Sequence, residues 1–283
     1  MGRKNIFQLL EENYDIQEEI QKINRLFNDE KYFIDEMVEY SFKVLLKDYL
    51  FDGWKYRGTC ITIEEYLKRV NADISYGWGK PTEEKIINFL EVMENFVKLY
   101  RDNLSRLMLY GIDCCEGFET VFLDLIATTE KNMGLTSREC GDKIIIYPQN
   151  APLEQAVVLC DDEDVQWDLI RYARGDIDFS EKRKILASLG LYIEPILKSR
   201  VLQNAGYKQL ESDIGFMLNC FHVRHNNKEG AKAQDYIIAL TDDQLEEWYD
   251  KLYNGILSVI IINDHIAVQT ELALLKTNYN WRM

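Results

Sequence analysis

The stretch LEEWYDKLYNGILSVIII, residues 245–262, determines the class of fold that this chain adopts. Apolar side chains recur in it at positions 245, 248, 252, 256 and 259. Intervals of three and four residues place these side chains on one face of an α-helix, so we expect a long helix over residues 241–262. Ile261 and Ile262 extend the apolar surface past one face, which is typical of a helix that is fully buried or shared with another subunit.

The same helical periodicity recurs through most of the chain. Only four prolines and fifteen glycines interrupt its 283 residues, and these are the residues that most disfavour helix interiors. We therefore expect a mainly α fold, a multi-helix bundle with more than half of the residues in helices and under a tenth in strands. The expected helices cover residues 5–27, 31–50, 81–110, 116–133, 163–174, 179–200, 207–222 and 241–262.

The helical pattern breaks near residues 135–150, which is the expected domain boundary. Residues 143–147 are rich in β-branched side chains and stop before Pro148, which is typical of a strand. Residues 156–159 are a second short apolar run, and two interpretations of it are open: it pairs with 143–147, or it closes a helical turn. We expect an N-terminal helical domain over 1–135 and a C-terminal helical domain over 150–283, with at most a small β-hairpin.

Composition limits the cellular setting and the partners of the chain. Hydrophobic residues make up 47% and charged residues 29%, as in globular proteins. The net charge of −15 argues against nonspecific binding to duplex nucleic acid, which needs many Lys and Arg contacts to phosphate. The six cysteines lack C-x-x-C spacing and no secretory leader precedes them, so we expect free thiols in the cytoplasm. No apolar run reaches membrane-spanning length, and we expect no membrane association.

Polar chemistry is concentrated in residues 219–227, Asn-Cys-Phe-His-Val-Arg-His-Asn-Asn, between two apolar helical segments. Histidine exchanges protons near neutral pH, and arginine is the cation best shaped to hold phosphate. Asn219 and His222 are three residues apart, so on a helix they would share a face. The candidate site consists of Arg224 and His225 as catalytic residues, with Asn219, His222, Asn226 and Asn227 as binding or orienting neighbours.

Further stretches combine with this cluster into a family resemblance. They are residues 168–176 (DLIRYARGD), 182–189 (KRKILASL), 192–195 (YIEP), and Asn219 with 223–227 (VRHNN). Together they resemble a bacterial abortive-infection protein with a C-terminal HEPN-like domain, over roughly residues 160–265. The resemblance implies a small helical bundle, metal-independent RNA cleavage in antiviral defence, and a homodimer in which two Arg-His motifs meet. HEPN ribonucleases place the histidine four to six residues after the arginine, whereas here His225 follows Arg224 directly.

Three interpretations of the cluster remain open. The first is a metal-independent endoribonuclease of phage-defence or toxin type, in which Arg224 holds the phosphate and His225 moves a proton. The second is a non-catalytic helical module that binds a nucleotide, RNA or a protein partner through the same residues. The third is a structural network at a helix junction. We expect no metal and no cofactor, and the expected partners are RNA and a second copy of the chain, bound through the C-terminal helices.

Overall fold

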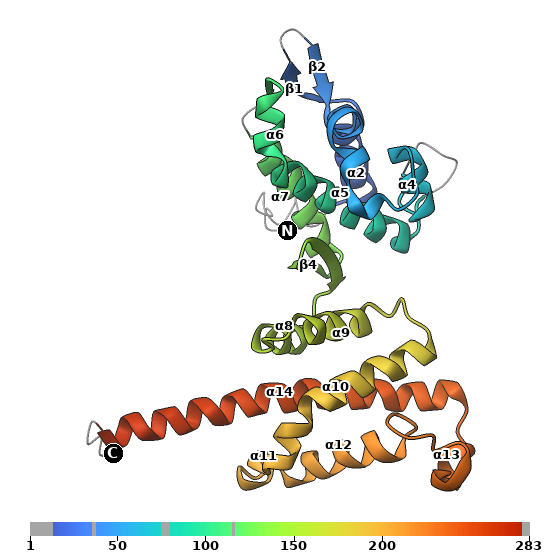
Figure 1. The fold of residues 1–283 in the computed structure, drawn as a ribbon, viewed down its shortest axis with the longest axis vertical. Helices are drawn as coiled ribbons and strands as arrows, with labels where there is room; N and C mark the ends of the chain where they lie inside the picture. Colours follow the sequence, from blue (N-terminus) through green and yellow to red (C-terminus); the bar gives the residue numbers. More distant parts are fainter. Residues whose placement is uncertain (1–13, 36–37, 75–79, 115–116, 279–283) are drawn as a thin grey trace, which may run out of the picture. The chain divides into compact units, whose positions relative to one another are not determined.

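The structure is a computed structural model, and it describes residues 14–35, 38–74, 80–114 and 117–278. The chain divides into two compact units, Met1–Ile146 (unit 1) and Tyr147–Met283 (unit 2). This division lies inside the interval 135–150 in which the helical sequence pattern breaks. Helices account for more than half of the described residues and strands for under a tenth, so the expected mainly α fold is confirmed (Figure 1).

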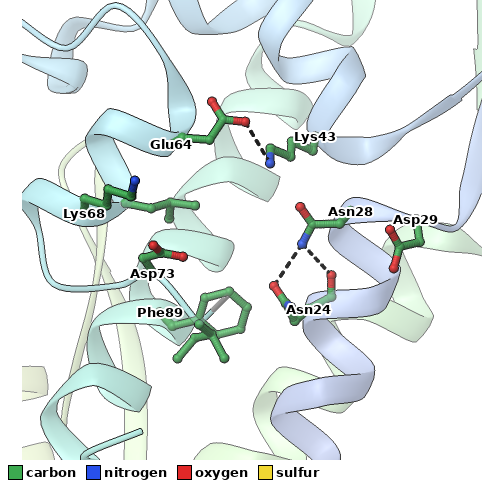
Figure 2. Close-up of a pocket in the computed structure, with 10 residues that line it drawn as sticks. Asn24, Asn28, Asp29, Lys43, Glu64, Lys68, Asp73 and Phe89 are labelled. Atoms are coloured by element: carbon green, nitrogen blue, oxygen red, sulfur yellow. Dashed lines mark hydrogen bonds and ion pairs between the residues drawn. The ribbon is translucent and has the colours of Figure 1, made fainter. Parts of the chain in front are cut away.

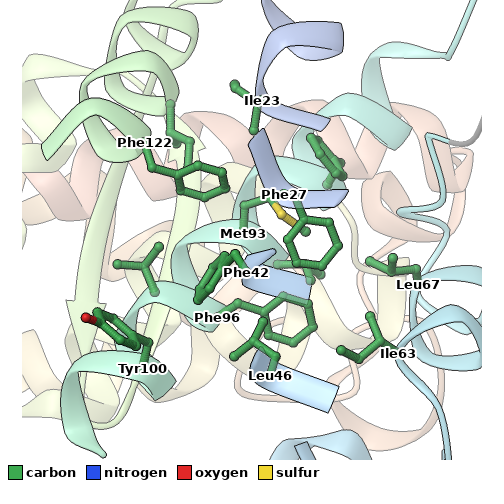
Figure 3. Packing of buried hydrophobic residues seen from close by; sticks show 14 of the residues in the cluster. Ile23, Phe27, Phe42, Leu46, Ile63, Leu67, Met93, Phe96, Tyr100 and Phe122 are labelled. Atoms are coloured by element: carbon green, nitrogen blue, oxygen red, sulfur yellow. The ribbon is translucent and has the colours of Figure 1, made fainter. Parts of the chain in front are cut away.

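Unit 1 is organised around helix α5 (Glu83–Asp102), which buries one long apolar face. The helix begins where the Thr82 hydroxyl accepts a hydrogen bond from the Lys85 amide, 3.3 Å away. Aromatic rings fill the core: Phe27 stacks on Phe96 with centroids 5.9 Å apart, and Phe42 meets Phe27 edge to face (Figure 3). The other helices are α2 (Ile16–Asn28), α3 (Phe42–Leu45), α4 (Ile63–Arg69), α6 (Leu104–Leu109) and α7 (Phe118–Asn132), with a π-helical turn (Leu46–Leu50) and two 3-10 turns (Phe51–Gly53, Lys55–Arg57).

A three-stranded antiparallel sheet replaces the first half of the helix predicted over residues 31–50. Its strands are β1 (Lys31–Asp35), β2 (Val38–Ser41) and β3 (Ile112–Cys114), in the order β2-β1-β3. Phe33 of β1 is opposite Tyr40 on one side and Cys114 on the other. The helical prediction is wrong here for two reasons. Aromatic residues occur in both helices and strands, so residues 31–41 do not distinguish the two. The strand β3, which pairs with the other edge of β1, lies far along the chain and cannot be recognised from local sequence.

A two-stranded sheet follows, made of β4 (Leu135–Cys140) and β5 (Lys143–Pro148). Gly141 opens the turn between them with φ +62°, a left-handed conformation that glycine adopts without steric cost. The strand predicted over 143–147 is therefore confirmed, but its partner is not the run 156–159. That run belongs to α8 (Ala151–Leu159), which Asn150 starts by accepting a hydrogen bond from the Leu153 amide.

Unit 2 is a bundle in which α10 (Phe179–Ser199) and α14 (Asp242–Asn278) contact most of the other helices. Within this unit, α8 and α9 (Glu163–Arg174) lie on one side of α10 and α14, and α12 (Lys208–Cys220) lies on the other (Figure 1). The side chains of Asp162 and Asp178 cap α9 and α10, so these helices begin where the sequence predicts. The remaining elements are α11 (Val201–Asn204), α13 (Asp235–Ile238) and a 3-10 turn (Gly230–Lys232).

Two glycines let α12 approach its neighbours closely. A Cβ atom built on Gly190 of α10 would lie 2.6 Å from Cδ2 of Leu218, and one built on Gly255 of α14 would lie 2.1 Å from Cδ1 of Ile214. Both distances are far below van der Waals contact. The apolar face of α12 therefore packs directly against the backbones of the two central helices.

Helix α14 is longer than the predicted segment 241–262, because it continues to Asn278. Its buried residues end at Ile260, and nearly every residue from 265 onward is exposed. By length and composition alone α14 is sufficient to cross a membrane, although the uninterrupted apolar run is short. The first half of the same helix forms the core of unit 2, so its apolar character is partly explained by packing.

Two expectations extend beyond the described residues. Of the helix predicted over 5–27, the structure describes the part from residue 14, which is α2. Cys60, Cys140, Cys160 and Cys220 form no disulfide, whereas Cys115 lies outside the described residues.

Candidate functional site

The predicted site residues lie where α12 ends and the chain turns toward α13. Helix α12 stops at Cys220, and His222 has φ +60°, a left-handed conformation that an L-residue adopts only at some steric cost. Asn219 is still helical and exposed, and its amide donates to the carbonyl of Gly215. The expectation that Asn219 and His222 share a helix face is therefore wrong, because the helix ends between them.

His222 and Asn227 form one closed hydrogen-bonded pair. The Asn227 amide N–H donates to Nδ1 of His222 at 3.1 Å, and the His222 amide N–H donates to Oδ1 of Asn227 at 3.0 Å. Asn227 also donates through Nδ2 to the carbonyl of Lys232 and is only 2% exposed. Burial, with the nearby charges of Arg183 and Lys228, lowers the pKa of His222. A neutral imidazole that accepts at Nδ1 holds the loop closed and is poorly placed to exchange protons with a ligand.

Arg224 turns inward, toward helix α10. One terminal nitrogen of its guanidinium donates to the carbonyl of Gly190 at 2.6 Å and lies 3.5 Å from a carboxylate oxygen of Glu194. The Nε atom is buried and has no hydrogen-bond partner. The strongest contacts of the guanidinium are therefore with α10 of the same bundle, close to the end of α12.

His225 turns to the surface and meets a residue that was not among the candidates. The ammonium of Lys232 lies 3.2 Å from both ring nitrogens, Nδ1 and Nε2, and Lys232 itself is exposed. The Arg224 and His225 side chains share no hydrogen bond, although the two residues are neighbours in sequence. Asn226 has a local role, because its Oδ1 accepts from the amides of Lys228 and Glu229 in a turn.

Side chains from other helices hold the backbone of this loop. Arg183 on α10 donates from Nε to the carbonyl of Val223 at 3.3 Å and from a terminal nitrogen to the carbonyl of His225 at 3.5 Å. The hydroxyl of Tyr249 on α14 donates to the carbonyl of His222 at 3.4 Å. These contacts fix the backbone from which the His225 ring projects, which is what a preorganised binding group requires.

Arg183 and Lys232 were missed by the sequence analysis for different reasons. Arg183 lies in the run Lys182-Arg183-Lys184. Nothing in the sequence distinguishes it from its two basic neighbours or predicts that it contacts residues 223–225. Lys232 is seven positions from His225 and is brought back by the loop, which the buried Asn227 closes. The positive charges around the loop stand out in a chain of net charge −15.

A separate feature lies within unit 1, where no candidate was expected. A cavity of about 360 Å³ is lined by residues of α2, α3, α4 and α5 and by the segment after α4 (Figure 2). Its polar members include Asn28, Lys43 and Lys68, and none of the six predicted site residues contributes to it. The three come from three different helices, so no local spacing in the sequence links them.

Within the described part of the chain, no group of three or more His, Cys, Asp or Glu side chains is arranged to hold a metal ion. No protein-family model, curated protein or solved structure matches this chain.

Proposed function

We propose that unit 2 binds the phosphate groups of single-stranded RNA through the loop of residues 222–232, without cutting it. The observation that carries this proposal is the pair of half-buried His225 and exposed Lys232, with the Lys232 ammonium 3.2 Å from both ring nitrogens. A phosphate oxygen beside this pair would receive hydrogen bonds from an ammonium and from an imidazole at the same time.

The surroundings of the pair favour a small and selective contact. The loop backbone is already held by Arg183, Tyr249 and Asn227, so little conformational freedom is lost when a ligand binds. The acidic surface of the rest of the chain repels long polyanions, which limits binding to a few nucleotides at this point. We leave Arg224 out of the proposed contact, because its guanidinium donates to the carbonyl of Gly190 and its Nε is buried.

RNA cleavage without a metal is the second candidate function. It is favoured by the same pair, since an imidazole can take the proton from a 2′-hydroxyl while an adjacent cation stabilises the charged phosphorane. The 2′-oxygen would form a new bond to phosphorus, the bond to the 5′-oxygen would break, and a proton would go to that leaving oxygen. The products would be a 2′,3′-cyclic phosphate and a 5′-hydroxyl. This candidate, and a role in phage defence, accord with the resemblance to HEPN-type abortive-infection proteins.

A single experiment separates the two candidates. End-labelled single-stranded RNA is incubated with the protein in EDTA at low salt, and binding is followed by fluorescence anisotropy while length is followed on a gel. Retention of intact RNA supports the binding module, and cleavage that survives EDTA supports the enzyme. If the RNA is bound and not cut, His225→Ala and Lys232→Ala should each weaken binding by about tenfold, a change that corresponds to about 1.4 kcal/mol. If the RNA is cut, His225→Ala should lower the cleavage rate by about a hundredfold or more, which is the usual loss when a positioned acid or base is removed.

Lys208→Ala is the matched control, because Lys208 is an exposed lysine of the same unit at the start of α12. It removes one positive charge without touching the loop, so it should leave binding nearly unchanged. Equal losses from Lys208→Ala and Lys232→Ala would show that only total charge matters and would contradict the proposed site. Absence of any RNA effect at micromolar protein would contradict both candidates.

A further inference from the structure

Exposed aromatic rings gather at the base of the loop of residues 222–232. Four aromatic side chains are exposed among the described residues of unit 2. Three of them, Phe216, Tyr236 and Trp248, have ring centroids 4.9–6.0 Å from that of Phe221, and we call these four residues the ring patch. Single exposed apolar side chains are common on protein surfaces, whereas a contiguous group marks a contact site.

The rings of this patch have defined orientations. Phe221 is buried, and its ring makes angles of 77° with Phe216 and 60° with Tyr236. The rings of Phe216 and Tyr236 lie within 17° of parallel, with centroids 6.5 Å apart, and they are 51% and 42% exposed. The Tyr236 hydroxyl is within hydrogen-bonding reach of the Cys220 thiol, which restrains its ring. Two exposed and nearly parallel rings suit a ligand that is itself a flat ring.

The third exposed ring already has a partner. The Lys251 ammonium lies 4.2 Å from the ring centroid of Trp248 and makes a cation–π contact with it. Phe216 and Tyr236 are therefore the members of the ring patch that remain for a ligand.

The charges beside these two rings favour an uncharged ligand. Asp213 is three residues before Phe216 on α12, and therefore on the same side of that helix, while Asp235 directly precedes Tyr236. Both aspartates are exposed. An anionic group would be repelled at the rings themselves, whereas a neutral nucleobase would not.

The ring patch is close to the proposed phosphate site along the chain. The loop leaves from Phe221 and returns to Tyr236, and these two rings are 6.0 Å apart. His225 follows Phe221 by four residues and Lys232 precedes Tyr236 by four, so each Cα lies at most about 14 Å from that of the neighbouring ring residue. About four nucleotides cover this distance, at the rise of roughly 3.4 Å per nucleotide in a stacked strand.

From this arrangement we infer that Phe216 and Tyr236 stack on bases of the same RNA whose phosphate groups His225 and Lys232 hold. The inference rests on the proposed function of unit 2 and adds the part of the ligand that the rings recognise. Every base has a flat face, so the contact selects single-stranded RNA, whose bases are free to stack, without selecting a sequence.

Two six-unit probes that differ only in their bases test the stacking. One is 2′-O-methyl adenosine hexanucleotide, which cannot be cut through a 2′-hydroxyl, and the other is a tetrahydrofuran spacer hexamer with the same phosphate groups and no bases. Both carry a fluorescent label and are titrated with the full-length protein in EDTA at low salt. We expect the adenosine probe to bind about tenfold more tightly, which is at the lower end of what base–aromatic stacking contributes.

Variants of the ring patch locate the stacking. Phe216→Ala and Tyr236→Ala should each weaken binding of the adenosine probe by about tenfold and leave binding of the spacer probe unchanged. Phe216→Tyr keeps a ring and should retain the preference for the adenosine probe, so a loss in Phe216→Ala can be assigned to the ring. Tyr207→Ala is the matched control, because Tyr207 is an exposed aromatic residue at the start of α12 that makes no ring contact with the patch. It should leave both affinities unchanged.

Lys232→Ala separates this inference from the proposed function, because it should weaken both probes equally. If the two probes bind equally well and Lys232→Ala weakens both, the phosphate site is supported and the inference is wrong, which would leave the rings to a protein partner. If the adenosine probe is preferred but Lys232→Ala has no effect, the ring patch is supported and the phosphate site is wrong. Equal losses from Tyr207→Ala and Phe216→Ala overturn the inference, and no binding of either probe at tens of micromolar protein contradicts both proposals.

Discussion

Arg224 and His225 are neighbours in sequence, yet their side chains have opposite surroundings. The Arg224 guanidinium is bonded to Gly190 and Glu194 of α10, whereas the His225 ring meets the exposed Lys232. The left-handed backbone at His222 and the buried Asn227 determine this split. Residue type alone indicates that both side chains suit phosphate chemistry, but only the direction of each side chain indicates which one a ligand can reach.

The inward position of Arg224 leads to a prediction about stability. Arg224→Ala should lower the free energy of unfolding by about 1–3 kcal/mol, because it removes a charged hydrogen bond and leaves Glu194 without this partner. His225→Ala should change it by less than about 0.5 kcal/mol, as is usual at a surface. Urea denaturation of both variants checks this. If Arg224→Ala is as stable as the wild type, Arg224 does not fasten the loop to α10.

Two carboxyl groups in the core of unit 1 lead to a prediction about pH. Burial raises the pKa of Glu94 to about 7. Burial, together with the charge of Glu94, raises the pKa of Glu130 to about 8. Glu94 accepts a hydrogen bond from Ser137, while one oxygen of each carboxyl is buried without a partner. Glu91 adds a further negative charge nearby, and Arg101 a positive one. In the unfolded chain both groups ionise near pH 4.5, so the folded state binds more protons between that pH and about 8.

Stability should therefore fall as the pH rises from 5.5 to 8.5. One pKa unit corresponds to about 1.36 kcal/mol, so Glu130 contributes a loss of about 3 kcal/mol over this range. Glu130→Gln cannot ionise, and its loss should be smaller than that of the wild type by about this amount. Denaturation at both pH values checks the difference, with Asp124→Asn, exposed on the same helix, as the control. Parallel pH profiles for wild type and Glu130→Gln would contradict the assignment.

At the scale of elements, glycines and caps decide how the helices of unit 2 meet. Asp162 and Asp178 begin two helices where the sequence predicts, which is a local effect. The close packing of α12 on α10 and α14 depends on Gly190 and Gly255 instead, and their importance is invisible until the facing side chains are known.

A pair of glycine substitutions tests this packing. Gly255→Ala should lower the free energy of unfolding by about 1 kcal/mol, because the new methyl group collides with the buried Ile214 and overpacking costs more than the gain in helix propensity. Gly215→Ala in α12 should raise it by up to about 1 kcal/mol, since its Cβ would meet no atom within 4 Å. Melting curves of both variants give the comparison. Stabilisation by both would show that α12 and α14 can separate without cost.

At the scale of the whole molecule, α14 extends past the bundle that its first half helps to form. Val268, Leu272 and Leu275 are 44%, 48% and 50% exposed, and their spacing places them on one face. Between residues 263 and 278 the charged residues are Asp264, Glu271 and Lys276, so this part is nearly neutral in an otherwise acidic chain. A second copy of the chain meets less repulsion there than elsewhere, and we propose that two α14 helices associate through this face.

Association through α14 should be visible as a change of mass. We expect light scattering at micromolar concentration to give about twice the monomer mass of 33.4 kDa. The double variant Val268→Asp, Leu272→Asp should give the monomer, because it places charges on the apolar face. Thr270→Asp, on the opposite face of the helix, should still give the dimer. A monomeric wild type would remove this proposal, and a dimer in all three proteins would place the interface elsewhere.

The sequence by itself determined the helical class of the protein, most helix positions in unit 2 and the interval that contains the division between units. These features arise from interactions between residues a few positions apart, such as the Asp178 cap or the apolar spacing in residues 245–262. Only the tertiary structure decided that residues 31–41 form strands, because their partner β3 comes from residues 112–114.

The tertiary structure also decided that Arg224 faces α10, that Lys232 joins His225, and that four helices of unit 1 line a cavity. Each of these depends on contacts between residues distant in the chain. Residue type and spacing do not encode the direction of a side chain after a loop closes. The chemistry of the candidate residues was therefore predictable from the sequence, whereas their accessibility was decided by packing.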